Sequence, residues 1–173
     1  MKKILLAICC FWALTSSAAM DVSALLPDAR MTGRGEFRYF GWLIYDATLY
    51  APQGQYRPGQ PFALTLRYHR QISRQQLADS SIEEITRLYP QKYHRERLAT
   101  WRERLLQALP DVRPGDQLTG VYEPEKGCRF FNQQQLISRI DDPELARAFF
   151  DIWLSPATRD PPLRQQLLGS RTP

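Results

Sequence analysis

Hydrophobic and polar residues alternate along several short segments, a pattern typical of β-strands with one buried face. The first two segments span residues 31–40 and 42–50, and both faces of the second are partly apolar. Residues 52–61 are rich in proline and glycine and break the pattern. Alternation returns over residues 62–69, where one face carries Phe62, Leu64, Leu66 and Tyr68. The first part of the chain therefore predicts three strands.

Two helices are predicted after the third strand. Ser73 and Gln76 have the spacing of a capping box, and the apolar residues that follow recur on one helical face. A second helix follows Pro90, with a buried stripe made by Leu98, Trp101, Leu105 and Leu109. Arginines and glutamates share its outer positions, which is typical of a solvated face.

The last part of the chain predicts an antiparallel meander and two more helices. The three short strands of the meander span residues 117–122, 128–132 and 136–140. Asp141 or Asp142 caps a helix that opens with Pro143, and a final short helix opens at Pro161 and closes at Gly169. This order predicts an α+β domain with helices over one face of an antiparallel sheet.

Residues 1–19 have the order of a secretory signal peptide. Two lysines precede an apolar run over residues 4–14, and small residues follow up to Ala19. The run is shorter than the ~20 residues that a membrane-spanning helix needs. We expect cleavage near Ala18 or Ala19 and a periplasmic or secreted product without a stable membrane span, in preference to an uncleaved anchor.

Removing 19 of the 173 residues leaves 154, a length that usually forms one domain. We place that domain at residues 20–169 and expect a disordered tail at residues 170–173. Loss of the two positive charges of Lys2 and Lys3 lowers the formal charge from +5 to +3. The remaining charge gives no reason to expect a nucleic-acid partner.

The three cysteines predict neither a disulfide nor a lipid anchor. Cys9 and Cys10 lie inside the apolar run, too early for a lipoprotein, and they leave with the signal. Cys128 is then alone in an exported chain, within an apolar and aromatic segment. We expect a buried thiol there rather than a nucleophile.

Motifs for metal, nucleotide or hydrolytic chemistry are missing from the sequence. The two histidines, His69 and His94, fall on different predicted elements without a neighbouring ligand pair. No Gly-x-Ser-x-Gly elbow occurs, and Gly33-Arg34-Gly35 lacks the length and the lysine of a phosphate-binding loop. We therefore expect no metal and no cofactor, and we assign no catalytic residue.

Arg34 and Arg38 on the first strand face an aromatic second strand that contains Trp42, Tyr45 and Tyr50. An arginine at the mouth of an apolar pocket can hold a carboxylate or a phenolate through charge-assisted hydrogen bonds. The residues alone favour the simpler interpretation, in which the arginines lie in water and the aromatic rings in the core.

Several segments, in this order and spacing, together resemble the bacterial chalcone isomerase-like family. They are Gly33 to Phe37, Tyr45 to Tyr50, the strand Phe62 to Tyr68, the turn Arg113 to Asp116, and the ending from Phe149 to Gly169. The resemblance implies an open-faced β-sandwich of the chalcone isomerase type, with a ligand cleft between the sheet and a helical layer. Plant enzymes of this fold cyclise chalcones, whereas other members bind fatty acids through an arginine and a tyrosine.

Carried over by position, the resemblance implies Arg34 as the anchoring arginine, with Arg38 as the alternative and Tyr45 as its partner. Trp101 or Tyr93 takes the place of a helical tyrosine of the enzymes, and Ile152 replaces a threonine that closes their site. The threonine of the enzymes' strand has no counterpart, and these losses argue against chalcone cyclisation.

Three functions follow from this pattern. The first is a non-catalytic exported protein that binds a fatty acid or a similar apolar carboxylate, with Arg34, Tyr45, Arg38, Trp101 and Ile152 as ligand-binding candidates. The second is an isomerase, an intramolecular lyase that acts on an unknown enone. The third is a structural or assembly partner in the cell envelope. The sequence does not decide the ligand or the oligomeric state.

Overall fold

The computed structural model describes residues 22–169. The predicted signal peptide at residues 1–19 and the predicted tail at residues 170–173 lie outside the described residues. The described part begins with a short 3-10 helix, η1, at Val22–Ala24.

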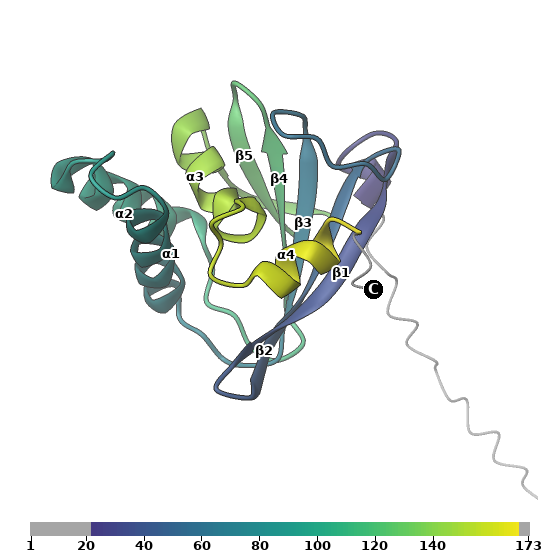
Figure 1. The fold of residues 1–173 in the computed structure, drawn as a ribbon, viewed down its shortest axis with the longest axis horizontal. Helices are drawn as coiled ribbons and strands as arrows, with labels where there is room; N and C mark the ends of the chain where they lie inside the picture. Colours follow the sequence, from purple (N-terminus) through teal and green to yellow (C-terminus); the bar gives the residue numbers. More distant parts are fainter. Residues whose placement is uncertain (1–21, 170–173) are drawn as a thin grey trace, which may run out of the picture.

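One antiparallel sheet of six strands forms the centre of the fold (Figure 1). The strands lie side by side in chain order, and each pairs with its sequence neighbour. Their bounds are β1 Ala29–Tyr39, β2 Trp42–Pro52, β3 Phe62–Tyr68, β4 Gln117–Glu123, β5 Gly127–Asn132 and β6 Gln135–Ile140. The predicted meander and the predicted opening strands are thus parts of the same sheet.

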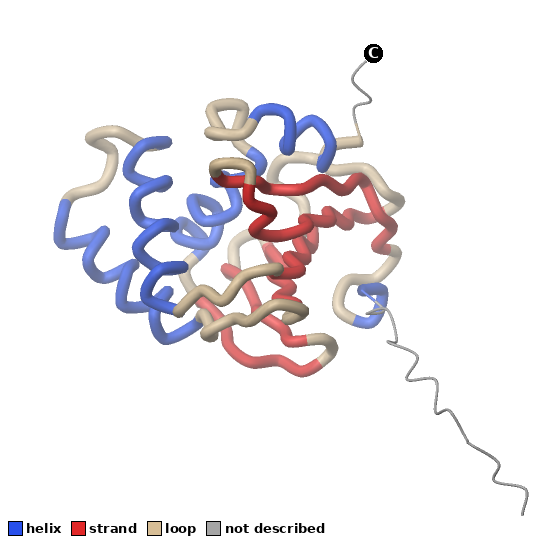
Figure 2. The backbone as a smooth tube through the Cα atoms, turned by 90° about the horizontal axis from the view of Figure 1, so that it is seen from below, coloured by secondary structure: helices blue, strands red, loops and turns tan. Residues whose placement is uncertain are grey.

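Four α-helices form a layer on one side of the sheet, as Figure 2 shows. Their bounds are α1 Arg74–Leu88, α2 Arg95–Ala108, α3 Pro143–Leu154 and α4 Pro161–Leu167. Helix α3 packs on β4 and β5, α4 packs on β1, and α1 lies between α2 and α3. The predicted α+β class, with helices over one face of an antiparallel sheet, is confirmed.

Local signals in the sequence start two of these helices. Ser73 and Gln76 form the predicted capping box of α1, with both the side-chain and the backbone hydrogen bonds present. Of the two aspartates considered for α3, Asp142 is the cap, and its carboxylate accepts hydrogen bonds from the backbone N–H groups of Glu144 and Leu145.

The main core lies between the sheet and the helices, where alternate strand residues meet the apolar faces of α1, α2, α3 and α4. A second, smaller cluster lies on the opposite face of the sheet. It consists of Val22, Leu26, Ala63, Val121 and Phe131. The hydrophobic pattern did not indicate this cluster, because residues 22–26 precede the first predicted strand and carry no alternation that assigns them to a face of the sheet.

Candidate functional site

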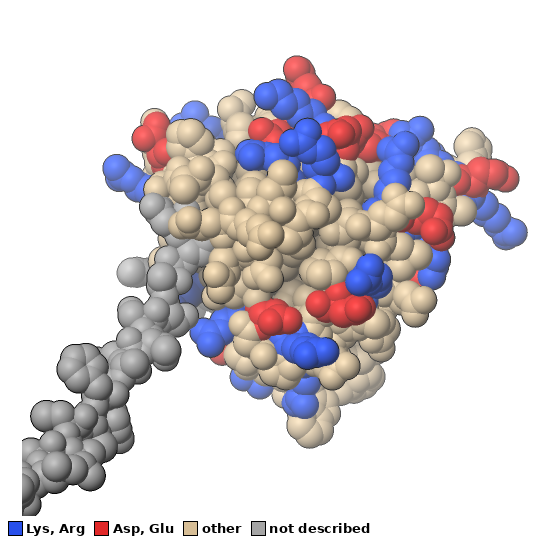
Figure 3. All heavy atoms as spheres, turned by 180° about the vertical axis from the view of Figure 1, so that it is seen from behind, with Lys and Arg blue, Asp and Glu red and all other residues tan. Residues whose placement is uncertain are grey.

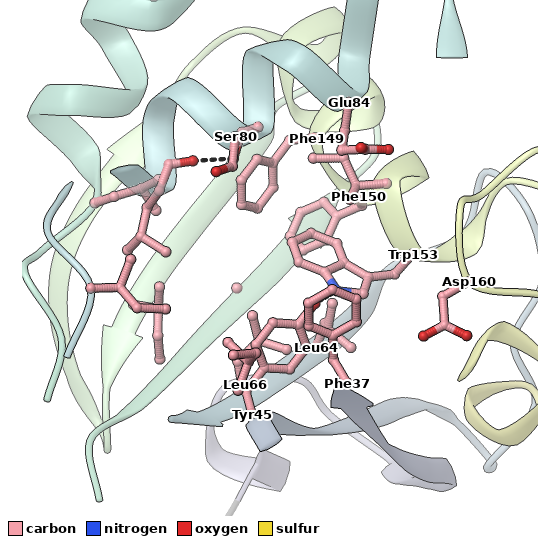
Figure 4. Close-up of a pocket in the computed structure, with 18 of the residues that line it drawn as sticks. Phe37, Tyr45, Leu64, Leu66, Ser80, Glu84, Phe149, Phe150, Trp153 and Asp160 are labelled. Atoms are coloured by element: carbon pink, nitrogen blue, oxygen red, sulfur yellow. Dashed lines mark hydrogen bonds between the residues drawn. The ribbon is translucent and has the colours of Figure 1, made fainter. Parts of the chain in front are cut away.

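A cavity of about 440 Å³ lies between the sheet and the helical layer. Its walls come from β1, β2, β3 and β4 on one side, and from α1, α3 and the segment that leads into α4 on the other. Figure 4 shows Phe37, Leu64 and Leu66 on the sheet side, with aromatic rings from α3 above them. The apolar lining includes Phe37, Ile44, Leu64, Leu66, Ile72, Leu77, Leu118, Phe149, Phe150, Ile152 and Trp153. This volume and lining suit a small apolar ligand.

Glycines allow the walls to approach one another closely. A Cβ at Gly33 would overlap the backbone oxygen of Gln166, and it would lie 2.6 Å from that of Leu167. A Cβ at Gly120 would lie 2.8 Å from the Phe150 ring that lines the cavity. The first glycine lets α4 pack directly on β1, and the second lets α3 bring an aromatic ring against β4.

Two tyrosines from neighbouring strands place their phenol groups in the cavity. Tyr45 and Tyr68 are paired across β2 and β3, and their rings meet edge to face with centroids 5.9 Å apart. The Tyr45 hydroxyl accepts a hydrogen bond of 2.9 Å from the indole Nε1–H of Trp153. The Tyr68 hydroxyl makes no hydrogen bond with any of residues 22–169. The lining therefore offers two phenol O–H donors that the protein itself does not use.

Burial raises the pKa of both phenols well above the usual range. For Tyr45, the indole donor works in the opposite direction, but the loss of hydration is the larger effect. Both groups are therefore neutral at any physiological pH, and they act as donors to a ligand atom that accepts hydrogen bonds.

The charged lining residues lie at the edge of the cavity, where Figure 4 shows Glu84 and Asp160 away from the aromatic cluster. Glu84 forms ion pairs with Arg159 at 2.7 Å and with Arg87 at 2.9 Å. Asp160 caps α4 by accepting a hydrogen bond from the backbone N–H of Leu163. Arg159 is the one cationic side chain among the described lining residues, and glutamates neutralise it. An anionic ligand group would find no free cation here.

Arg34 and Arg38 lie on the other face of the sheet. Phe37 is opposite Tyr45 and points into the cavity, whereas Arg34, three positions earlier, is opposite Thr48. Because side chains alternate along a strand, Arg34 points away from Tyr45. Both arginines line a second, polar depression together with Glu36, Asp46, Thr48 and Arg67, and this depression shares only Asp160 with the cavity. The expected pairing of Arg34 with Tyr45 in one pocket is therefore wrong.

The family model for chalcone isomerase-like proteins matches residues 30–169 of this sequence. The chain belongs to the chalcone isomerase-like family. This confirms the resemblance drawn from the sequence segments and covers the described domain almost completely.

A solved structure shares the fold. The crystal structure of a fatty-acid binding protein from Arabidopsis thaliana is similar with a TM-score of 0.60 and 12% sequence identity, covering 83% of this chain and 88% of that chain. At this identity the likeness shows the chalcone isomerase fold alone. No curated protein matches the sequence.

Within this chalcone isomerase-like fold, the remaining candidates separate into two groups. Tyr45 and Ile152 line the cavity, as the resemblance implied. Trp101, on α2, does not line the cavity. Its ring is buried in the core, and its indole N–H donates to Asp142 at the start of α3. Tyr68 was not singled out as a site residue, although its register opposite Tyr45 could have indicated it once the two strands were aligned.

No group of three or more His, Cys, Asp or Glu side chains among residues 22–169 could hold a metal ion. No helix in the same range combines the length and the apolar character needed to cross a bilayer.

Proposed function

We propose that this protein binds a fatty acid or a similar apolar ligand in the cavity between the sheet and the helices, without acting on it chemically. The observation that carries this proposal is a largely apolar cavity in which two buried, neutral phenols, Tyr45 and Tyr68, have O–H donors that the protein does not use. The Arabidopsis protein that shares the fold is itself a fatty-acid binding protein, which supports the same class of ligand.

The polar end of the ligand meets the two tyrosine hydroxyls, and its chain lies against the leucines and phenylalanines of the walls. A carboxyl group, an ester or a ketone can accept both hydrogen bonds. The acidic edge formed by Glu83, Glu84 and Asp160 favours a ligand whose polar end is neutral when bound. Arg34 has no part in this arrangement because it lies on the other face of the sheet.

Displacement of a fluorescent fatty acid from the purified protein in solution tests the assignment. Tyr68→Phe removes one donor without changing the shape of the cavity, and we expect palmitic acid to bind about three to ten times more weakly. Ser80→Trp places a large ring at the exposed edge of the cavity and should prevent binding.

Tyr50→Phe is the matched control, because Tyr50 lies on β2 like Tyr45 but on the face of the sheet opposite the cavity. This variant should bind palmitic acid as tightly as the parent protein. Arg34→Ala should also bind normally. Loss of binding in Arg34→Ala, together with normal binding in Tyr68→Phe, would place the polar end of the ligand on the other face and overturn the tyrosine assignment.

We also propose that the protein works in the periplasm or outside the cell after residues 1–19 are removed. The support is the charged, apolar and small-residue order of that segment. N-terminal sequencing of protein recovered from a periplasmic fraction should find a start at residue 19 or 20. Protein that starts at Met1 and stays in the cytosol would contradict export.

The isomerase and envelope-partner hypotheses stay predictions. Turnover of an enone that is lost in Tyr45→Phe would favour the first, because a buried phenol is the group in the cavity best placed to donate to a developing oxyanion.

A further inference from the structure

The turn between β1 and β2 carries three aromatic side chains that the protein leaves in solvent. We call residues Tyr39–Trp42 the hairpin tip. Tyr39 is 59% exposed, Phe40 is 86% exposed and Trp42 is 63% exposed. The Tyr39 and Phe40 rings are in contact with centroids 4.6 Å apart, and Trp42 is the strand partner of Tyr39 across the turn. Exposed apolar side chains gathered in this way usually mark an interaction site. Figure 3 shows the lower end of the molecule as a protrusion with largely uncharged surface, with basic and acidic side chains above it.

The backbone of the tip makes Phe40 an unexpected residue at its position. Phe40 has φ 46° and Gly41 has φ 81°, so both residues adopt the left-handed conformation of a two-residue hairpin turn. Asparagine, aspartate or glycine is favoured at the first of these positions, and a bulky residue there is strained. The Phe40 ring stacks edge to face on its neighbour Tyr39 and does not reach the core. The fold therefore gains little from this phenylalanine, whereas a binding surface would gain much.

Basic groups surround the rings. The Arg70 guanidinium lies 4.6 Å from the centre of the Trp42 ring and forms no ion pair with the described carboxylates. Arg38 pairs with Glu36 at 2.8 Å, but both side chains are about half exposed, and such surface pairs are weak. The tip thus offers one guanidinium that no described carboxylate neutralises, Arg70, whose Nε donates only to the Leu43 carbonyl, and a second, Arg38, whose exposed ion pair an anion can replace.

The tip also adjoins the cavity. Tyr39 belongs to the tip and lines the cavity, and Ile44, two residues after Trp42, lines it as well. A partner that covers the tip would therefore lie against the entrance used by an apolar ligand. Exposed tyrosine and tryptophan rings beside arginines are the combination found where proteins meet the headgroup layer, so the tip favours a lipid surface over a folded protein partner.

We propose that the hairpin tip docks on the surface of a bilayer that contains anionic phospholipids. Tyr39, Phe40 and Trp42 insert at the level of the headgroups, the depth at which tyrosine and tryptophan are enriched in membrane proteins. Arg70 and Arg38 pair with lipid phosphates, and such basic groups each add to surface attraction. Transfer of a ligand between bilayer and cavity rests on the proposed function, but the docking itself does not.

Flotation with vesicles tests the docking. The parent protein should bind vesicles of phosphatidylglycerol and phosphatidylcholine more tightly than vesicles of phosphatidylcholine alone. Phe40→Asn removes the most exposed ring and suits the left-handed backbone, so the variant should unfold at the same or a higher temperature. Its partition onto the mixed vesicles should fall about tenfold or more, the loss expected for one inserted phenylalanine.

Met31→Ser is the matched control, because Met31 is 56% exposed but lies at the far end of β1, opposite Tyr50. Its vesicle binding should equal that of the parent.

Arg70→Gln should remove much of the preference for phosphatidylglycerol and weaken the dependence of binding on salt. Trp42 emission should shift to shorter wavelength on vesicles, and Trp42→Phe should abolish the shift.

Absence of parent binding to both kinds of vesicle would overturn the proposal. Equal binding by the parent, Phe40→Asn and Trp42→Ser would also overturn it, even if the protein bound lipid, because contact would then lie elsewhere. Fatty-acid displacement is measured in solution without vesicles. Failure of docking can therefore be separated from failure of the proposed ligand site.

Discussion

Gly33 and Gly35 illustrate how single residues set the distance between layers. Both glycines face α4, and neither leaves room for a Cβ. A Cβ at Gly33 meets the backbone of Gln166 and Leu167, whereas one at Gly35 meets side chains, the amide of Gln166 and the Leu163 methyl. Backbone cannot move aside as easily as the end of a side chain. The pair of glycines therefore serves the packing of α4 rather than the binding of phosphate.

This difference predicts a graded effect on stability. Gly33→Ala should lower the free energy of unfolding by about 2–3 kcal/mol, the upper part of the range for overpacked positions. Gly35→Ala should cost about 1 kcal/mol, because side chains can adjust. Urea denaturation of both variants measures the difference. Equal and small losses would show that α4 does not rest on β1 as closely as described.

Cys128 is a buried thiol, as expected from its surroundings. Burial, helped by the nearby carboxylates of Glu123 and Asp141, raises the pKa of the thiol from 9.0 to about 12. The folded state therefore keeps its proton at a pH where the unfolded state has lost it. It follows that this thiol reduces stability as the pH rises above 9.

The sign of this linkage predicts alkaline destabilisation. Between pH 9 and pH 12 the folded protein binds more protons at Cys128 than the unfolded protein, so the unfolding free energy falls with rising pH. Cys128→Ala should make this fall shallower, although its cavity lowers stability at neutral pH. A thiol reagent should modify Cys128 slowly in the native protein and rapidly in urea. Fast native modification would contradict the burial.

At the scale of elements, one carboxylate joins the start of α3 to α2. Asp142 caps α3 through two backbone N–H groups, and it accepts further hydrogen bonds from Trp101 Nε1 at 3.1 Å and Arg104 Nη1 at 2.6 Å. Ser73, by comparison, caps α1 within its own first turn. Asp142 therefore contributes to the packing between helices as well as to a helix end.

Asp142→Ala should destabilise the protein by about 2–4 kcal/mol, since it removes a cap and leaves the buried indole N–H of Trp101 without an acceptor. Ser73→Ala removes only a cap and should cost about 1 kcal/mol. Asp142→Asn keeps one acceptor oxygen and should fall between the two. Thermal unfolding of the three variants checks the order, and an equal loss in all of them would assign Asp142 to capping alone.

For the whole molecule, a ligand that binds only the folded state raises its stability. Palmitic acid at about 100 times its dissociation constant should add about 2.7 kcal/mol to the unfolding free energy. The shift should be absent in Ser80→Trp and unchanged in Tyr50→Phe. Scanning calorimetry with and without the acid measures it. The same shift in Ser80→Trp would mean that the acid binds outside the cavity.

The sequence by itself determined the strands, the helices and several of their ends, because these depend on neighbours along the chain. Alternation over residues 62–69 predicts β3 within one residue of its observed end, and the capping box at Ser73 marks the start of α1. Pro143 likewise marks the first residue of α3. The ordered set of segments was also sufficient to indicate the chalcone isomerase-like family, which the family model confirms.

The tertiary structure alone decided which of these residues share a site. Register between strands determines the face on which each side chain lies, and a difference of three positions puts Arg34 and Phe37 on opposite faces. Tyr68 joins Tyr45 because β3 pairs with β2, a contact between residues far apart in the sequence. In the sequence, Trp101 fits both the buried stripe of a helix and the position of a ligand-binding side chain. Only the tertiary structure, in which its indole N–H donates to Asp142, assigns it to the packing between helices. Local periodicity contains no information about such pairings, since they depend on how distant segments are aligned.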